Sequence, residues 1–285
     1  MAGVLDEIVF TPLGGHMAVA VEGVDLRRPP DAALTNRLRQ ALWDNMVLCI
    51  RGQSIDPGQY LAAISLFGEP QIRPEIPHVP GFPGVTTLSS QDRDTNGDGK
   101  RLIAGANWHT DDSFMAKPSA LTALYGIEVP SVGGDTQFAN MYAAYGALPA
   151  EERAYLDTLR AVHMMKPDRP GLNRTRTIAP EILAARPPST HPIVRTHPET
   201  GRKAIYVGPS RIDHIVGMGR EESWALVDRL VAHATQPQFT YRHKWRQGDI
   251  VIWDNRCLMH KANGDYAEHE SRFMQRIIVE GEIPV

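Results

Sequence analysis

The sequence has little cysteine and little net charge, and it lacks any long hydrophobic run. Its formal charge is -3, which gives no sign of a nucleic-acid or acidic-membrane partner. The two cysteines, Cys49 and Cys257, each lie in an apolar, strand-like stretch. Buried free thiols in a reducing compartment are therefore expected rather than a disulfide.

The amino terminus also lacks the features of a targeting segment. It carries Asp6 and Glu7 rather than a basic region before an apolar stretch, and no segment of the chain is long enough to span a bilayer. A cytoplasmic protein that binds neither membrane nor nucleic acid is expected. With 285 residues, 42% of them hydrophobic and 22% charged, the chain is expected to form a single domain over residues 1–285.

Short apolar stretches alternate with turns rich in Gly and Pro. The pattern predicts helices at 32–43, 57–66, 141–148, 151–159 and 220–235. It predicts strands at 17–21, 46–50, 85–88, 120–129, 136–138, 193–196, 203–207, 239–245, 250–253 and 271–279. Loops are expected at 69–84 and 89–105, and an irregular, Pro-rich cover at 166–188. Many short strands with added helices favour an antiparallel sandwich or barrel of the jelly-roll kind.

The run Trp108-His109-Thr110-Asp111 offers two metal ligands separated by one residue. Side chains alternate along an extended strand, so His109 and Asp111 can reach one ion from the same side. With a second His they would form the 2-His-1-carboxylate set of non-haem Fe(II) oxygenases. His260, which follows the apolar strand at 250–253, is a candidate for that third ligand, although by itself it could equally be a structural hydrogen-bonding residue.

Arg272 and Arg276 are four residues apart on the last predicted strand and are expected to share a face. Two guanidinium groups on one buried face would need anions, and each can hold a carboxylate with two hydrogen bonds. The alternative is a solvated strand face with surface ion pairs.

The segment from Asp92 to Gly97 copies the start of an EF-hand calcium loop. Its twelfth position is Ile103, where a bidentate Glu is required, and no flanking helices are predicted. Residues 92–100 are interpreted instead as a solvated loop beside the candidate metal ligands, able to close over a substrate.

These segments together resemble the taurine dioxygenase/2,4-dichlorophenoxyacetate dioxygenase family of Fe(II)- and 2-oxoglutarate-dependent oxygenases. The resemblance runs through GVDLRRP, MVLCIRGQ, NWHTDDSF, PSVGGDTQFANMYAAY, HPIVRTHPETGRKAIYV and GDIVIWDNRCLMHKANGDY, in that order. It implies a mainly β fold with added helices around a double-stranded β-helix, which is a cupin-like jelly roll.

The resemblance also implies roles for individual residues. His109, Asp111 and His260 would hold Fe(II) and leave sites for 2-oxoglutarate and O2. Thr136 and Arg272 would bind the far carboxylate of 2-oxoglutarate, and Arg276 the acidic group of the substrate. Succinate and CO2 would be coproducts, and the hydroxylated product could then break a carbon–heteroatom bond. Related halogenases lack the carboxylate ligand, so Asp111 favours hydroxylation.

The substrate region departs from the family pattern. Arg73 and Ile76 stand where taurine dioxygenases have a His and a Tyr, and Arg211 replaces a Phe. The covering segment also offers Arg169. An arginine-rich pocket repels the ammonium group of taurine, so a larger organic acid with more than one anionic or polar group is expected. Arg73, Arg211 and Asp112, the residue next to the ligand Asp111, are the candidates for contacting it.

The leading prediction is an oxygenase that hydroxylates a small anionic substrate, such as a carboxylate, sulfonate, sulfate or aryloxyalkanoate. A zinc-dependent hydrolase or lyase using the same three ligands is an alternative, as is a non-catalytic metal-binding protein of the same fold. The paired arginines favour the oxygenase, since a zinc hydrolase needs no binding site for a dicarboxylate. Family members often form dimers or tetramers, so a homo-oligomer is expected.

Overall fold

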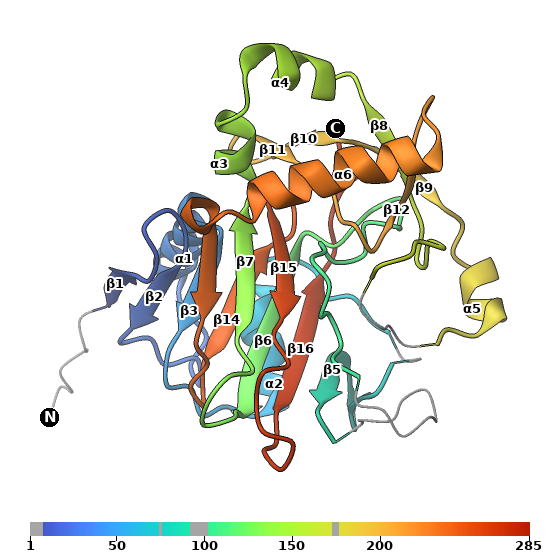
Figure 1. Ribbon diagram of the computed structural model, residues 1–285. Helices are drawn as coiled ribbons and strands as arrows, with labels where there is room; N and C mark the ends of the chain where they lie inside the picture. Colours follow the sequence, from blue (N-terminus) through green and yellow to red (C-terminus); the bar gives the residue numbers. More distant parts are fainter. Residues whose placement is uncertain (1–7, 74–75, 92–101, 173–176) are drawn as a thin grey trace, which may run out of the picture.

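The computed structural model describes residues 8–73, 76–91, 102–172 and 177–285, and Figure 1 shows their arrangement. The loop proposed to close over the substrate, 92–100, lies outside this part of the chain. Among the described residues, no helix is both long and apolar enough to cross a membrane.

Two facing sheets form the jelly-roll core (Figure 1). The larger sheet has eight strands in the order β1-β2-β3-β14-β6-β16-β5-β4. These are β1 Val9–Pro12, β2 Val19–Glu22, β3 Val47–Ile50, β14 Ile250–Asp254, β6 Leu121–Glu128, β16 Phe273–Val279, β5 Phe82–Ser89 and β4 His78–Val79. The smaller sheet has the order β13-β7-β15, with β13 Thr240–His243, β7 Thr136–Asn140 and β15 Leu258–Ala262.

Two smaller β units complete the strands. The sheet β12-β8-β9 consists of β12 Ile212–Ile215, β8 Arg160–His163 and β9 Ser189–Pro192. A hairpin pairs β10 Val194–Thr196 with β11 Lys203–Ile205, as the His-Pro-Glu-Thr-Gly turn between them predicts. The jelly-roll fold class predicted from the sequence is confirmed.

The helices lie against the large sheet and above the upper end of the small sheet (Figure 1). The helices α1 Ala32–Asn45 and α2 Pro57–Ser65 pack a second apolar cluster against the large sheet, and α2 starts with the capping box of Asp56 and Gln59. Above the small sheet lie α3 Met141–Gly146, α4 Ala150–Leu156 and α6 Arg220–Ala234, which crosses the top of Figure 1. A short helix, α5 Pro180–Ala184, interrupts the cover that the sequence predicts to be irregular, and a 3-10 turn covers Pro237–Phe239.

The main core lies between the two sheets. Phe138 of β7, Trp253 of β14 and Met274 of β16 are buried there. Phe138 and Trp253 meet edge to face with ring centroids 5.5 Å apart, which is a favourable aromatic geometry. This packing fixes the inward side of β14, β15 and β16, from which the candidate site residues project.

Several predicted boundaries differ from the structure. Six strands, β1, β4, β8, β9, β12 and β15, were not predicted, and β4 lies in a stretch expected to be a loop. The extended strand expected around His109 is wrong: His109 makes a single bridge to His260, and Asp111 begins a turn. The predicted strand at 271–279 begins at Phe273, so Arg272 precedes it.

A pair of buried histidines joins β8 to β9. The rings of His163 and His191 lie 5.3 Å apart, and Tyr206 stacks on His163 at 5.7 Å. Burial, with the charges of His191 and Arg211, lowers the pKa of His163 to about 3. His163 is therefore neutral in the folded protein at neutral pH.

This pair predicts loss of stability in acid. The unfolded chain binds a proton at His163 below about pH 6.5, whereas the folded chain does not until about pH 3, so stability falls as pH drops through that window. Between pH 7.5 and 5.0 the loss from this group is about 2 kcal/mol. Urea unfolding should show a smaller loss for His163→Phe than for the wild type. His269→Phe, at an exposed histidine, should leave the pH dependence of the free energy of unfolding unchanged. If the free energy of unfolding fell equally with pH in both variants, His163 would not be the group responsible.

Candidate active site

His109, Asp111 and His260 converge on one point between the two sheets. The backbones of His109 and His260 exchange two hydrogen bonds, of 3.0 and 2.8 Å, and their ring centroids lie 4.2 Å apart. The two carboxylate oxygens of Asp111 lie 3.6 Å from His109 Nε2 and 3.7 Å from His260 Nε2. Donor atoms about 2.1 Å from a shared ion and at right angles to one another lie about 3 Å apart, so the three side chains fit a facial metal site.

Hydrogen bonds behind the ligands fix their orientation. His109 Nδ1 lies 2.7 Å from the carbonyl oxygen of Asn107, which leaves Nε2 to face the site. Thr122 Oγ1 donates to Asp111 Oδ2 at 2.7 Å, and Asn255 Nδ2 donates to Thr122 Oγ1 at 2.9 Å. Asn255 Oδ1 in turn accepts a 3.1 Å hydrogen bond from the indole of Trp253. The carboxylate is thus held by a connected polar network anchored on β14.

The protonation states also suit metal binding. Burial alone would raise the pKa of Asp111, but His260, His109 and Arg276 outweigh it and hold that pKa well below its ordinary value. Burial, together with the charges of His109 and Arg276, lowers the pKa of His260 to about 3. An ionised carboxylate and a neutral imidazole are the forms that coordinate a metal.

Thr136 and Arg272 are both neighbours of Trp245. The indole nitrogen of Trp245 donates to Thr136 Oγ1 at 3.1 Å, and the guanidinium carbon of Arg272 lies 6.0 Å from the Trp245 ring centroid. Arg272 Nε donates to the carbonyl oxygen of Gly134 at 2.9 Å. Gly134 has φ +68°, and an added Cβ would lie 3.3 Å from Arg272 Cδ, so a glycine here lets the arginine approach.

Arg272 has no carboxylate partner among the described residues. Burial lowers its pKa, and Asp135, the acid that acts on it, already forms an ion pair with Arg242 at 2.6 Å. A half-buried guanidinium that contacts a backbone carbonyl and an indole ring, with no carboxylate among the described residues, fits an anion supplied from outside the protein.

Arg276 lies on β16, and its Nε donates to Thr86 Oγ1 at 3.2 Å. Its charge lowers the pKa values of both Asp111 and His260, so its guanidinium lies near the ligands. A β-bulge between Phe273 and Met274 separates it from Arg272. Arg276 therefore lies near the metal ligands, whereas Arg272 lies beside Trp245 and just before the strand on which both were expected.

Arg73 and Asp112 bind each other. Two hydrogen bonds, of 2.5 and 3.2 Å, join the guanidinium to the carboxylate, which also accepts a hydrogen bond from Ser119. Asp112 has φ +53°, a strained value for a residue other than glycine, immediately after the ligand Asp111. The pair adds no net charge to this side of the site.

The other two candidate arginines differ from each other. Arg169 pairs with Asp228 of α6 at 2.5 Å and lies 5.8 Å from the Trp224 ring, so it ties the cover to that helix. Arg211 instead lies 5.2 Å from the Phe114 ring, and its charge acts on Asp111 and Asp112. Arg211 therefore lies near the metal ligands, whereas Arg169 is held on α6.

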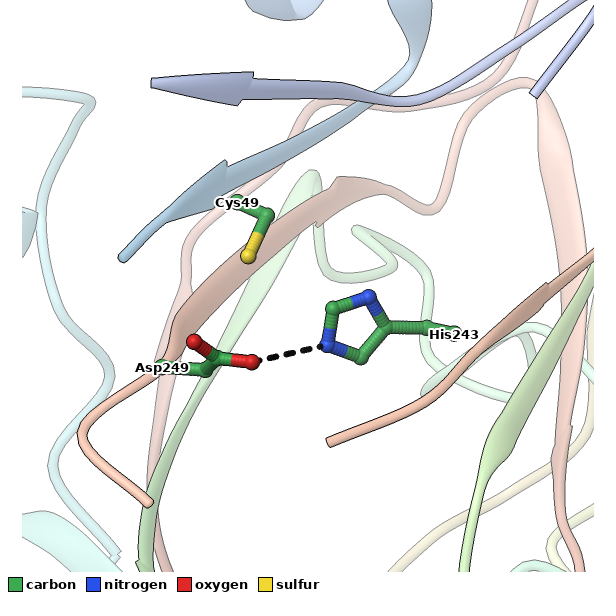
Figure 2. Close-up of side chains that lie close together, drawn as sticks. All are labelled: Cys49, His243 and Asp249. Atoms are coloured by element: carbon green, nitrogen blue, oxygen red, sulfur yellow. Dashed lines mark ion pairs between the residues drawn. The ribbon is translucent and has the colours of Figure 1, made fainter. Parts of the chain in front are cut away.

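A second group of possible ligands, Cys49, His243 and Asp249, is fully buried (Figure 2). His243 Nε2 lies 3.4 Å from Asp249 Oδ2, and Arg51 already forms an ion pair with that carboxylate oxygen. Burial and the charge of Asp249 raise the pKa of Cys49 to about 12, which keeps the thiol protonated. This group is an internal ion pair, and Cys49 and Cys257 are both buried and free as predicted.

Comparison with known proteins decides the family. Residues 10–278 match the family described as "Taurine catabolism dioxygenase TauD, TfdA family". The chain belongs to this TauD/TfdA family. It is 33% identical over 265 residues to the alpha-ketoglutarate-dependent 2,4-dichlorophenoxyacetate dioxygenase of Cupriavidus pinatubonensis, covering 90% of this chain and 92% of that one.

Two further TauD/TfdA relatives extend the comparison. The alpha-ketoglutarate-dependent sulfate ester dioxygenase of Pseudomonas putida is 32% identical over 289 residues, covering 98% of this chain and 91% of that one. The crystal structure of AAD-2 in complex with Mn(II) and N-oxalylglycine has a TM-score of 0.83 at 32% identity, covering 98% and 99% of the two chains.

Membership of the TauD/TfdA family confirms the predicted enzyme class. The chain is a 2-oxoglutarate-dependent dioxygenase, and the cofactors predicted with it, Fe(II), 2-oxoglutarate and O2, are those of that class. The zinc-dependent and non-catalytic alternatives are not favoured. The supporting residues Thr122, Trp245 and Asn255 were not among the site residues predicted from the sequence. Asn255 lies within the segment GDIVIWDNRCLMHKANGDY, which carries part of the family resemblance, whereas Thr122 and Trp245 lie outside the quoted segments.

Proposed function

We propose that this dioxygenase hydroxylates a small anionic organic molecule with the residues predicted from the sequence. The observation that carries this proposal is the half-buried guanidinium of Arg272, which has no carboxylate partner among the described residues and shares Trp245 as a neighbour with Thr136, in a protein that also brings His109, Asp111 and His260 together. A dicarboxylate cosubstrate supplies the anion that this guanidinium lacks.

The three ligands would hold Fe(II), which supplies activation of O2 coupled to the conversion of 2-oxoglutarate into succinate and CO2. Thr136 and Arg272 would bind the far carboxylate of 2-oxoglutarate and fix its distance from the ligands. Arg276, which is charged and close to the ligands, would hold the acidic group of the substrate and orient the carbon to be hydroxylated. We propose that residues 1–285 form one catalytic domain.

Arg73 and Asp112 are proposed to line the substrate site as a pair. Their mutual ion pair keeps each charge compensated, so the pair would position the substrate by shape and by hydrogen bonds rather than by net charge. Arg211 is proposed as a further substrate-binding residue, from its position beside Phe114 near both aspartates.

The relatives indicate the kind of acid to test. Their names record 2,4-dichlorophenoxyacetate, sulfate esters and (S)-phenoxypropionate. A panel of aryloxyalkanoates, alkyl sulfates, sulfonates and carboxylates should be incubated with enzyme, Fe(II), ascorbate, 2-oxoglutarate and air while succinate is measured. At least one class should stimulate succinate formation clearly above the rate without substrate. Failure of 2-oxoglutarate to bind the Fe(II) form would contradict the proposal as a whole.

Product analysis on the same samples decides whether hydroxylation leads to cleavage, because release of phenol, sulfate or sulfite follows only from collapse of a hydroxylated carbon that bears the heteroatom. The homo-oligomer and the cytoplasmic location expected from the sequence stay predictions. Static light scattering of the purified chain tests whether it forms the dimer or tetramer.

A further inference from the structure

The described part of the chain leaves three arginines near the active site without a carboxylate partner. They are Arg272, Arg276 and Arg211, whose guanidinium groups donate to the Gly134 carbonyl, the Thr86 hydroxyl and the Met165 carbonyl. The other two arginines considered as substrate contacts, Arg73 and Arg169, are each paired with an aspartate at 2.5 Å. The proposed function accounts for two anions, the far carboxylate of 2-oxoglutarate and one acidic group of the substrate. One guanidinium is left over.

Arg211 is held firmly in place at the start of β12. Its backbone N–H donates to the Gly208 carbonyl at 3.0 Å, and its own carbonyl accepts from Met164 at 2.7 Å. The guanidinium lies against the Phe114 ring and donates through Nη1 to the Met165 carbonyl, while Nε is buried and has no hydrogen-bond partner among the described residues. A side chain fixed at both ends in this way is preorganised to receive an acceptor.

The surroundings of Arg211 do not compensate its charge. His163, the histidine on which Arg211 acts, is neutral at neutral pH because its pKa is lowered to about 3. The carboxylates on which Arg211 acts are Asp111, which points at the two histidine ligands, and Asp112, which is bound by Arg73. A largely buried cation with no anion of its own destabilises the protein unless an anion binds there.

We propose that the substrate carries a second anionic group, a carboxylate, sulfonate or sulfate, and that Arg211 binds this group while Arg276 binds the first. This inference rests on the proposed function and names the substrate class within it: diacids rather than monoacids. The two guanidinium groups both act on Asp111, so the carbon held between the two acidic groups would lie close to the metal ligands. A substrate with an ammonium group at the second position would be repelled.

Matched probes test this proposal directly. Phenoxyacetate and 4-carboxyphenoxyacetate form one pair, and 1-butanesulfonate and 4-sulfobutanoate form another. Their dissociation constants for the Fe(II) enzyme with 2-oxoglutarate, measured by calorimetry without O2, should favour the diacid by roughly ten- to a hundredfold in at least one pair, as expected for a charge-assisted contact. Arg211→Gln should bring that ratio close to one by weakening the diacid much more than the monoacid, whereas Arg276→Gln should weaken both members of the pair.

Two further variants serve as controls. Arg211→Lys keeps the charge and should retain most of the preference, which separates loss of charge from a folding defect. Arg169→Gln removes an arginine that is already paired and should leave the ratio at the wild-type value. A wild-type ratio near one in every pair, or a preference that survives Arg211→Gln, would overturn the proposal, as would binding of neither member of either pair. Binding of 2-oxoglutarate is measured separately. The proposed function depends on that binding, so a failure of the diacid preference would leave the proposed function standing.

Discussion

Replacing Asp111 with alanine should abolish substrate-dependent succinate formation while the protein stays folded. The carboxylate oxygens of Asp111 lie 3.6 and 3.7 Å from the two imidazoles, so the variant removes the one anionic ligand of the proposed site. Loss of an outer hydrogen-bond partner of a metal ligand costs roughly 10–100-fold in metal affinity or activity. Loss of the ligand itself should exceed that range. Metal content after gel filtration and the succinate rate measure the effect.

Two variants calibrate this result. Thr122→Val removes only the 2.7 Å hydrogen bond to the carboxylate and should give the smaller, outer-partner effect. Glu22→Ala, at an exposed end of β2, should behave as the wild type. Circular dichroism should show the same fold for all three. If the Asp111→Ala protein kept the wild-type iron content and succinate rate, Asp111 would not be a ligand.

Replacing Arg272 with leucine should raise the concentration of 2-oxoglutarate needed for half-maximal turnover by a hundredfold or more. Breaking a buried, hydrogen-bonded charge pair costs about 3–5 kcal/mol, which corresponds to roughly a hundred- to several-thousandfold in binding. The dissociation constant of 2-oxoglutarate with the Fe(II) enzyme measures this effect without any primary substrate. Arg272→Lys should have a dissociation constant for 2-oxoglutarate between those of the wild type and Arg272→Leu, because lysine keeps the charge but lacks the planar pair of donors.

The stability of this variant separates a binding role from a structural one. Without 2-oxoglutarate the half-buried Arg272 charge has no carboxylate partner among the described residues, so Arg272→Leu should be at least as stable as the wild type. Arg256 is the contrasting control, since it is buried and bonded to Asp254 and Glu199. Arg256→Leu should be strongly destabilised. A large loss of stability in Arg272→Leu together with unchanged 2-oxoglutarate binding would show that Arg272 serves the fold.

The sequence predicted the elements whose signals are local. The start of α2 follows from Asp56 as an N-cap before Pro57 at the first helical position, and the structure adds the capping-box hydrogen bond of Gln59. The strand β14 follows from the apolar run Ile250–Trp253. By contrast β8, β9 and β12 are short strands that pair with one another across long sequence separations, so no local pattern predicts them.

The candidate site also combines contacts that the local sequence predicts with contacts that only the fold determines. His109 and Asp111 share a side because a short extended stretch alternates side chains, even though no regular strand forms there. The ion pair of Arg73 with Asp112, 39 residues apart, and the difference between Arg169 and Arg211 depend on how separate loops pack. Sequence spacing carries no information about such contacts, and this is why the arginines of the substrate region could not be ranked before the fold was seen.

The backbone bridge between His109 and His260 has a consequence for how the enzyme is made. During synthesis the first two ligands leave the ribosome long before β15 exists, and β16, which follows Arg272, comes later still. A nascent chain therefore holds only one imidazole and one carboxylate, which bind divalent metals weakly. Iron is expected to be loaded only after the carboxyl-terminal strands have docked. Truncated or stalled chains would then bind little metal. The iron content of a preparation of this protein would therefore measure the fraction of chains that have folded completely.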